Sequence, residues 1–470
     1  MIKNYLLLLL VLNCLVANVI AQAPNWQWAT SIGGTGATNE GIARIKVDVV
    51  GNVYGVGVFN GTVDFDPGAG IFNLTSSGRD IFIYKIDVAG NFIWAKQIGG
   101  TGINDNGMDI TLDSLNNIYI LGYFDGTTDF DPTFAVYNLT SSGSSFISKF
   151  DSAGGFQWVT AIGEMGTGSF ALDLSGNIYI TGGFNGTIDF DPGVGVFNLT
   201  TSASTGGAMY ISKFSGPGLF NWAKQFGGYN DYVNAIAVDY SGNVFTTGTF
   251  NGSSDFDPGA GTFYLTTFLN PPPSADWEPF ILKLDSAGDF IWAKQMVGSP
   301  GSDNEGTAIV SDAFGNVYTT GFFTVTVDFD PGAATFILTP VTGNDIFISK
   351  LDSSGNFVWA KQMGGSNLYN GWGSGYSIAI GNNGSGDVYT AGTFVDTADF
   401  DPGAGTYFLS SNGWYDVFIS RITASGNFVW AKSMGGTGIE YNPSIAVNTM
   451  GNCYIAGDFS SPVITAGTNV

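Results

Sequence analysis

Apolar stretches and turn residues alternate along the whole chain, and this pattern predicts a protein made of short antiparallel strands. An apolar stretch at 45–48 is followed by the pair Gly51-Asn52 and then by a second apolar stretch from Val53. Glycine and asparagine both tolerate the positive φ that a tight hairpin requires, so we expect the chain to reverse there. A second hairpin follows at 87–92. Two hairpins per unit give four strands, named strands a, b, c and d in chain order.

The polarity of the strands predicts how a unit packs. Strand a, for example 235–238, is small and apolar almost throughout, which is typical of a strand buried on both faces. Strand c alternates, so that Phe82 and Tyr84 face one side while Ile83 faces the other. A single four-stranded sheet cannot bury two apolar faces, and each unit must therefore stack between neighbours. Radial stacking of such sheets gives a β-propeller.

The unit recurs about seven times, with a tryptophan in strand d of each copy. Neighbouring tryptophans are 64–71 residues apart, at Trp28, Trp94, Trp158, Trp222, Trp292, Trp359 and Trp430. Repeats of this length are supersecondary units that bury their apolar faces against each other. We therefore predict an all-β fold, a seven-bladed β-propeller of four-stranded antiparallel blades. It would form a single domain over 22–470, with repeats of 60–73 residues.

The two ends of the chain predict how the ring closes. After a leader the chain begins with an isolated strand d at 26–32, and it ends after strands a and b of a seventh unit, near Ile445 and Tyr454. A last blade shared between the N- and C-termini would remove two exposed sheet edges. We expect 26–32 to form the outer strand of the blade that contains Tyr454. Because the sequence stops at Val470, before a seventh strand c, either the chain is truncated or this blade is incomplete and is the weakest part of the ring.

Charge and composition narrow the possible functions. The chain has 15 lysine and arginine residues against 39 aspartate and glutamate residues, which gives a net charge of −24. Such a surface repels nucleic acid and anionic membranes, and it attracts cations or basic partners. The sequence contains no histidine, which excludes the commonest general base and the commonest ligand of zinc and copper. We predict no catalytic residue.

Residues 1–21 have the features of a secretory signal peptide, with Lys3 before an apolar stretch and small residues at the end. A lipoprotein anchored through Cys14 is the less favoured alternative, because Asn13 is a poor residue before a lipidated cysteine. The leader is short for a membrane span and nothing comparable follows, so we predict a secreted or cell-surface protein with no transmembrane span. Only Cys453 remains after cleavage, and the mature chain can form no intrachain disulfide.

The most regular polar motif is Asp-Phe-Asp-Pro, which lies between strands b and c in six of the units. In an extended segment its two carboxylates share one face, about 7 Å apart, and the phenylalanine points to the other face. One interpretation is a repeated calcium site, because Ca²⁺ prefers carboxylate oxygens. The other is a turn held by hydrogen bonds to aspartate, and it is favoured because the third carboxylate of a calcium loop is missing. The candidate ligands are Asp64, Asp66, Asp129, Asp131, Asp189, Asp191, Asp255, Asp257, Asp328, Asp330, Asp399 and Asp401.

Departures from the repeat are the candidates for ligand binding. A proline-rich insertion precedes Trp277 in the fourth unit. An insertion before the sixth unit contains Tyr369 and Trp372, and the sixth unit itself contains the pair Trp414-Tyr415. Exposed tryptophan and tyrosine side chains on loops suit sugar stacking or protein contact. The alternative is ordinary loop variation with a packed aromatic side chain.

The order of strand a, Gly-Asn hairpin, strand b and a lysine-ended strand c resembles NHL-type propeller repeats. With Asp-Phe-Asp-Pro-Gly at 64–68 and Trp-Ala-Lys-Gln at 94–97, the whole unit is more similar to the SBBP-type β-propeller repeat of bacteria. The resemblance extends over about the full mature chain and rests on six near-complete copies. It implies a secreted or surface propeller and no defined activity.

These features favour a secreted or cell-surface scaffold for binding or adhesion, without catalysis and with an extracellular glycan or protein as its partner. The alternative is a polysaccharide-active hydrolase or lyase that uses Asp and Tyr at the mouth of the propeller. Paired carboxylates do occur in glycoside hydrolases, but an active site is a single constellation and six copies argue against one. We expect a monomer that binds no nucleic acid, with Ca²⁺ as the one candidate cofactor.

Overall fold

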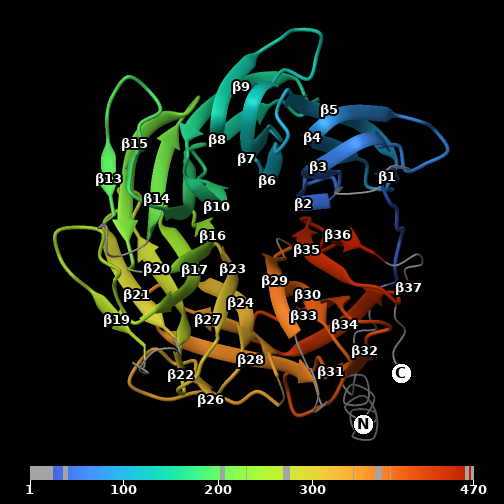
Figure 1. Ribbon diagram of the computed structural model, residues 1–470. Helices are drawn as coiled ribbons and strands as arrows, with labels where there is room; N and C mark the ends of the chain where they lie inside the picture. The colour runs from blue at the N-terminus through green and yellow to red at the C-terminus, as the bar shows by residue number, and fades with distance from the viewer. Residues whose placement is uncertain are drawn as a thin grey trace, which may run out of the picture.

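The computed structural model is all-β, and the part of the chain that it describes contains strands and no helix. Its sheets follow one another around a common centre, and the colour runs once round the molecule from blue to red (Figure 1). The structure describes residues 25–34, 41–201, 207–228, 230–267, 276–341, 343–365, 373–381, 383–460 and 465–466. Within these ranges no helix is long and apolar enough to cross a membrane.

Four main strands recur in each of the first six repeats. The first two repeats contain β2 (Gly41–Val47), β3 (Val53–Asp64), β4 (Asn73–Ile86) and β5 (Phe92–Gly100), then β6 (Asn106–Leu112), β7 (Ile118–Asp129), β8 (Asn138–Phe150) and β9 (Phe156–Gly163). The next two contain β10 (Gly166–Leu172), β11 (Ile178–Phe184), β14 (Ala208–Ser215) and β15 (Leu219–Phe226), then β16 (Tyr232–Val238), β17 (Val244–Asn251), β20 (Trp277–Leu284) and β21 (Phe290–Gln295). The fifth and sixth contain β23 (Glu305–Ser311), β24 (Val317–Phe323), β27 (Asp345–Leu351) and β28 (Phe357–Gly365), then β29 (Gly373–Ile380), β30 (Val388–Phe394), β33 (Asp416–Ile422) and β34 (Phe428–Gly435). The last repeat contains β35 (Glu440–Val447) and β36 (Cys453–Phe459).

Short strands lie between or beside the main ones. They are β1 (Gly33–Gly34), β12 (Thr187–Asp189), β13 (Asn198–Thr200), β18 (Ser253–Asp255), β19 (Tyr264–Thr266), β22 (Val297–Gly298), β25 (Val327–Asp328), β26 (Ile337–Leu338), β31 (Thr397–Asp399), β32 (Phe408–Ser410) and β37 (Thr465–Ala466). Pairs such as β12–β13 and β18–β19 are antiparallel ribbons that carry the Asp-Phe-Asp-Pro motif out from strand b and back to strand c. Each motif therefore lies on a hairpin extension between strands b and c, called here the excursion.

Strand order within a repeat follows the chain. The third repeat is a four-stranded antiparallel sheet in the order β10-β11-β14-β15, and the fourth has the order β16-β17-β20-β21. This arrangement confirms the unit of four antiparallel strands joined by two hairpins.

An aspartate stabilises each hairpin between strands a and b in the first five repeats. Asp48 Oδ1 accepts hydrogen bonds from the backbone N–H groups of Val50, Gly51 and Asn52 at 2.9–3.1 Å. Gly51 has a φ of 103°, which a residue with a side chain rarely adopts. Equivalent bonds are made by Asp113, Asp173, Asp239 and Asp312. The Gly-Asn pair therefore marks the turn, and the aspartate before it satisfies the N–H groups of the turn.

The hydrophobic core lies between successive sheets. Leu121 of the second repeat belongs to the same buried cluster as Ile180 of the third. Likewise Ile45 of the first repeat packs in one cluster with Ala446 of the last. Full burial of such an aliphatic side chain stabilises the fold by about 1.5–3 kcal/mol. Each sheet thus depends on its neighbours, as the polarity of the strands predicts.

Backbone pairing also joins one repeat to the next. The glycines that end strand d pair with the excursion of the following repeat, for example Gly99 with Asp129 and Gly364 with Asp399. In the same way Gly435 of the sixth repeat pairs with Thr465. These pairings place the excursions and the d-to-a glycine loops on the same rim, as strand order predicts.

The first and last repeats are neighbours in space. The backbone N–H of Ile45 donates to Ser444 Oγ at 3.1 Å, across 399 residues of sequence. The same contact at the same distance joins the N–H of Ile445 to Ser377 Oγ, between the sixth and last repeats. Strands β2 and β35 accordingly lie side by side (Figure 1).

The N-terminal segment differs from the prediction. Residues 26–32 form no strand, and only β1 pairs, with Val63 and Asp64 of β3. Trp28 nevertheless lies against Tyr454, with ring centroids 6.3 Å apart. The segment runs beside the last repeat (Figure 1) but, among the described residues, no strand c lies between it and β36. The predicted strand is therefore wrong, because its backbone has no neighbour with which to pair.

Candidate functional site

Each Asp-Phe-Asp-Pro segment is a turn held together by its own carboxylates. In the first repeat Asp64 Oδ1 accepts hydrogen bonds from the backbone N–H groups of Asp66 at 3.1 Å and Phe72 at 2.8 Å. Asp66 Oδ1 accepts one from the N–H of Gly68 at 2.8 Å. The Phe65 side chain is fully buried. The first aspartate thus ties the two arms of the excursion together, and the phenylalanine anchors the excursion to its sheet.

The same geometry recurs in the other five copies. The first aspartate accepts two backbone N–H groups at 2.7–3.1 Å in Asp129, Asp189, Asp255, Asp328 and Asp399. The second accepts one at 2.8–3.0 Å in Asp131, Asp191, Asp257, Asp330 and Asp401. No group of three or more Asp, Glu, Cys or His residues in the described ranges could hold a metal ion. These contacts support the turn interpretation, and calcium binding at the pairs stays a prediction.

Shallow grooves lie beside two of the excursions. A cavity of about 420 Å³ is bounded by Trp222 and Lys224 of the third repeat and by Pro258 of the fourth excursion. A cavity of about 380 Å³ has the equivalent position between Trp28 and Pro67. Each groove presents a tryptophan near a proline of the next excursion, and both are by-products of the repeat.

Two of the predicted aromatic residues occupy equivalent positions in the fourth and sixth repeats. Trp277 and Tyr415 each come directly before the acidic residue at the start of strand c, which is Glu278 in one repeat and Asp416 in the other. Both acidic side chains are fully buried. The backbone of each aromatic residue also bonds to the next repeat. The Trp277 N–H donates to the carbonyl of Ser302, in the loop before β23, and the Tyr415 carbonyl accepts from the N–H of Glu440, the first residue of β35, each at 2.9 Å.

Each of these residues has a tyrosine neighbour that sequence reasoning missed. The ring centroid of Trp277 is 5.6 Å from that of Tyr232, the first residue of β16. Burial raises the pKa of Tyr415, and nearby Tyr376 of β29 raises it further. Tyr232 and Tyr376 are 56% and 41% exposed. A tyrosine within the first half of an otherwise small and apolar strand a is the signal that could have identified both.

Trp414 is exposed, with 67% of its surface accessible, and its backbone N–H donates to the carbonyl of Gly438 in a loop at 3.2 Å. Tyr369 and Trp372 lie outside the described residues. The set that the structure supports is named here the aromatic face. It consists of Tyr232 and Trp277 on the fourth repeat and of Tyr376, Trp414 and Tyr415 on the sixth.

Buried carboxyl groups accompany the aromatic face. Burial raises the pKa of Glu278 to about 7. Burial also raises the pKa of Asp416 to about 6, and the adjacent Glu440 adds to this shift. The pKa of Glu305 is raised by burial too, although its Oε1 accepts a hydrogen bond from Asn234 Nδ2 at 2.7 Å. The face therefore combines stacking surfaces with carboxyl and carbonyl acceptors, which suits sugars or peptide side chains.

A second repeated constellation joins successive repeats near the other hairpins. Lys213 Nζ lies 4.8 Å from the ring centroid of Tyr179, and the Trp222 ring meets the same tyrosine edge-on at 6.1 Å. Lys213 Nζ and Trp222 Nε1 both donate to the carbonyl of Ser286 in the next repeat, at 3.0 and 3.4 Å. This set of tyrosine, lysine and tryptophan, named here the latch, therefore joins neighbouring sheets through hydrogen bonds to one carbonyl.

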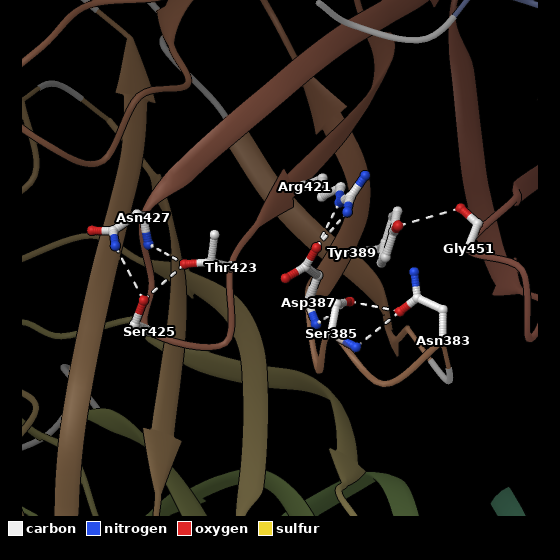
Figure 2. A network of polar contacts seen from close by, with 9 residues as sticks. All are labelled: Asn383, Ser385, Asp387, Tyr389, Arg421, Thr423, Ser425, Asn427 and Gly451. Carbon is white, nitrogen blue, oxygen red and sulfur yellow. Dashed lines mark hydrogen bonds and ion pairs between the residues drawn. The ribbon is translucent and has the colours of Figure 1, made fainter. Parts of the chain in front are cut away.

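The sixth repeat departs from this latch. Arg421 replaces the lysine, and its Nε and Nη2 donate to Asp387 Oδ2 at 2.9 and 2.5 Å (Figure 2). Its guanidinium carbon is 5.4 Å from the ring centroid of Tyr389. The Tyr389 hydroxyl donates to the Gly451 carbonyl of the last repeat at 3.3 Å (Figure 2). The cation here is held within its own repeat.

Comparison with known proteins identifies the repeat. A family model described as a β-propeller repeat, SBBP, matches residues 93–131 and 221–257. An uncharacterized WD repeat-containing protein of Acanthamoeba polyphaga mimivirus is 23% identical over 521 aligned positions, which cover 93% of this chain. The alignment covers 36% of that protein, so this chain spans about a third of the relative's length.

Two solved structures show weaker similarity. An auxiliary nutrient binding protein from Bacteroides ovatus is 12% identical, with 89% of this chain and 98% of that chain covered and a TM-score of 0.27. The extracellular domain of a putative one component system from B. thetaiotaomicron is 10% identical, with 91% and 81% covered and a TM-score of 0.17. TM-scores this low establish no common fold.

Both matched segments cover the same part of the unit. Each runs from strand d of one repeat, through strands a and b of the next, into the Asp-Phe-Asp-Pro excursion, and the same order of strands recurs along the chain. The chain therefore carries β-propeller repeats of the SBBP type.

Proposed function

We propose that this protein is a secreted or cell-surface binding scaffold that presents the aromatic face to an extracellular glycan or protein. The scaffold is a seven-bladed β-propeller whose last blade is shared between the two chain ends. The predicted signal peptide at 1–21, which lies outside the described residues, supports export.

The contact between the first and last repeats supports the closed ring. The hydrogen bond from Ile45 to Ser444 is equivalent to the one from Ile445 to Ser377. The first repeat therefore packs against the last repeat in the same way as the last repeat packs against the sixth. Trp28 packs on Tyr454 as the strand d tryptophans pack on the strand b aromatic residues elsewhere. A closed ring leaves fewer sheet edges open to unwanted pairing.

The single observation that carries the proposed function is that, in two repeats, a half-buried aromatic residue just before the acidic residue of strand c accompanies an exposed tyrosine of strand a. Trp277 interacts with Tyr232, and Tyr415 interacts with Tyr376. The other complete repeats have a small or polar residue in the place of Trp277 and Tyr415, namely Arg79, Gly143, Gly207 and Asn344. Exposed aromatic side chains cost solubility, and their concentration at one end of the strands marks a contact surface. Two such pairs flanking the fifth repeat suit an extended ligand that contacts both.

The strong negative charge defines the partner further. With a net charge of −24 the scaffold attracts basic peptides and cations and repels polyanions, whereas its charge does not exclude neutral glycans. Calcium at the twelve motif aspartates is a subsidiary proposal, in which the excursions and not the aromatic face would hold the ion.

A glycan and protein array probed with the purified protein, in Ca²⁺ and in EDTA, tests this function. We expect saturable binding to at least one ligand class, and we expect Trp414→Ala and Tyr376→Ser each to weaken it about tenfold. The matched control is Tyr240→Ser, which removes a tyrosine that is 65% exposed on a hairpin between strands a and b. Absence of binding in both conditions, or equal loss in the control, would overturn the proposal.

A further inference from the structure

We propose that the inner ring of strands a binds a small carboxylate through Arg44 and Lys46 of β2. Each strand a contacts the strand a of the next repeat, and β35 of the last repeat contacts β2 of the first. Together they are the innermost strands of the molecule (Figure 1). Arg44 and Lys46 are two residues apart in β2, so their side chains share one face of that strand. The two residues are named here the cation pair.

The cation pair has no counterpart in the other described strands a. Lys46 lies opposite Tyr54 of β3 in the first hairpin. The residues in the same register elsewhere are uncharged, namely Thr111, Ala171, Ala237, Val310, Ala379 and Ala446. Those in the register of Arg44 are Asp109, Ser169, Ala235, Ala308, Ser377 and Ser444. The packing of the repeat therefore requires no cation at either position.

Almost all other basic residues belong to the repeat itself. Outside the leader, every lysine and arginine lies at a repeated position of strand c or d except Arg44, Lys46 and Arg79. Lys213 of the latch shows the structural use of such a residue, since it contacts an aromatic ring and donates to a carbonyl of the next repeat. Two cations thus lie on one inner strand of a protein with a net charge of −24, and the repeat gives no reason for them.

Arg44 also takes the place of a hydrogen-bond acceptor. At the contact between the last and first repeats, Ser444 Oγ accepts the backbone N–H of Ile45 at 3.1 Å. Ser444 is in the register of Arg44, but a guanidinium group has donors only. The equivalent N–H in the second repeat, that of Ile110, donates instead to Oδ1 of Asp109 beside it, at 2.9 Å. Arg44 therefore cannot make the contact that joins the last repeat to the first.

The surroundings leave the cation pair short of negative charge. Lys46 is exposed and Arg44 is half-buried, and neither belongs to an ion pair in the described part of the chain. Burial lowers the pKa of Lys46, while Asp109 of β6 opposes this shift and Arg44 adds to it. A side chain that solvent reaches but whose charge is poorly hydrated lies in a recess. Asp109 Oδ2 already accepts the hydroxyl of Ser169 at 2.9 Å, so two cations face one carboxylate that is bonded elsewhere.

These features specify a ligand with one carboxylate group. A guanidinium group binds a carboxylate through two parallel hydrogen bonds, and an adjacent ammonium group adds a point charge. Two cations against one carboxylate leave one positive charge, which a single anionic group neutralises. The overall charge of −24 opposes a doubly charged ligand such as phosphate. The ligand is thus a small monocarboxylate, and its site on the inner strands is independent of the aromatic face.

Isothermal titration calorimetry at constant ionic strength tests this site. Acetate and D-glucuronate should bind saturably, whereas their uncharged amides should not bind and doubly charged phosphate should bind more weakly. Arg44→Gln and Lys46→Gln should each weaken the binding of D-glucuronate about tenfold or more, because each removes a hydrogen bond between charged groups. The matched control is Arg79→Gln, which changes the net charge by the same amount in the same repeat and should leave binding unchanged.

Stability measurements separate ligand binding from a structural role. Removing either cation should leave the urea midpoint of the ligand-free protein unchanged or raised, because an unpaired charge in a poorly hydrated place costs stability. Trp414→Ala should leave D-glucuronate binding unchanged, so that a failure of the aromatic face does not affect this result. Absence of carboxylate binding, equal binding of the amides, tighter binding of phosphate, an equal loss in Arg79→Gln, or a lowered midpoint in either cation-pair variant would each overturn the proposal.

Discussion

The excursions recur in six repeats, whereas the aromatic face occurs in two, and the two regions differ in how their side chains are bonded and buried. In the excursions the carboxylates bond to nearby N–H groups and the phenylalanine is fully buried, as for Asp328 and Phe329. In the aromatic face the side chains stay accessible, as for Trp414. Six closely similar turns therefore reflect what each sheet needs in order to fold, whereas we propose that the two unequal aromatic sites serve a ligand outside the molecule.

The two regions should differ most in how much a substitution lowers the free energy of unfolding, and removal of the buried phenylalanine of an excursion should have the largest effect. Phe329 is fully buried, and its ring centroid lies 5.5 Å from that of Phe323 and 5.1 Å from that of Phe347. Phe329→Ala should lower the free energy of unfolding by about 3–5 kcal/mol. Trp414→Ala should change it by less than about 0.5 kcal/mol. Urea denaturation measures both, and similar losses would remove the distinction between the two regions.

A smaller effect is expected from the first aspartate of the motif. Asp328 Oδ1 accepts the N–H groups of Asp330 and Phe336, whereas Asp330 accepts only that of Gly332. Asp328→Ala should therefore cost about 1–2 kcal/mol, and Asp330→Ala less, since hydrogen bonds to charged groups are worth about 1.5–3 kcal/mol and these are partly exposed. The same denaturation experiment compares the two variants. Equal costs would mean that closing the excursion adds nothing to stability.

Local motifs were the part of this structure that the sequence could predict. The Gly-Asn hairpins, the excursions and the four-stranded unit depend on residues close together in the chain, such as Asp48 and Gly51. The strand at 26–32 was not predicted correctly, because strand formation depends on a neighbour that is absent from the described residues. Tyr232 and Tyr376 were missed because their partners lie 45 and 39 residues away in sequence, at Trp277 and Tyr415.

Stability should fall as the pH rises from about 5 to 8. Burial raises the pKa of Asp345 and Asp416 to about 6 and that of Glu278 to about 7. Unfolded carboxyl groups titrate near pH 4, so the folded state binds more protons in this window, and the stabilisation is lost as the pH passes the folded-state pKa values. Melting temperatures at constant ionic strength should show the decline, and Asp345→Asn together with Asp416→Asn should flatten it. A melting temperature that rises with pH would contradict these shifts.

The smallest effect concerns calcium. If the motifs are turns, millimolar Ca²⁺ and EDTA at equal ionic strength should give melting temperatures within about 1 °C, because an ion that does not bind the folded state adds no stability. A clear increase in Ca²⁺ that is reduced by Asp189→Asn with Asp191→Asn would instead support the calcium interpretation. That outcome would give the repeated segments a function of their own.

The most direct test compares both regions within the sixth repeat, using a ligand found on the arrays. Tyr376→Ser and Trp414→Ala should weaken its Kd about tenfold and leave the urea midpoint unchanged. Asp399→Ala, which removes the acceptor for the N–H groups of Asp401 and Tyr407, should lower the midpoint and leave the Kd of the folded protein unchanged. The reverse pattern, with binding lost in Asp399→Ala and retained in the two aromatic variants, would contradict the assignment of binding to the aromatic face.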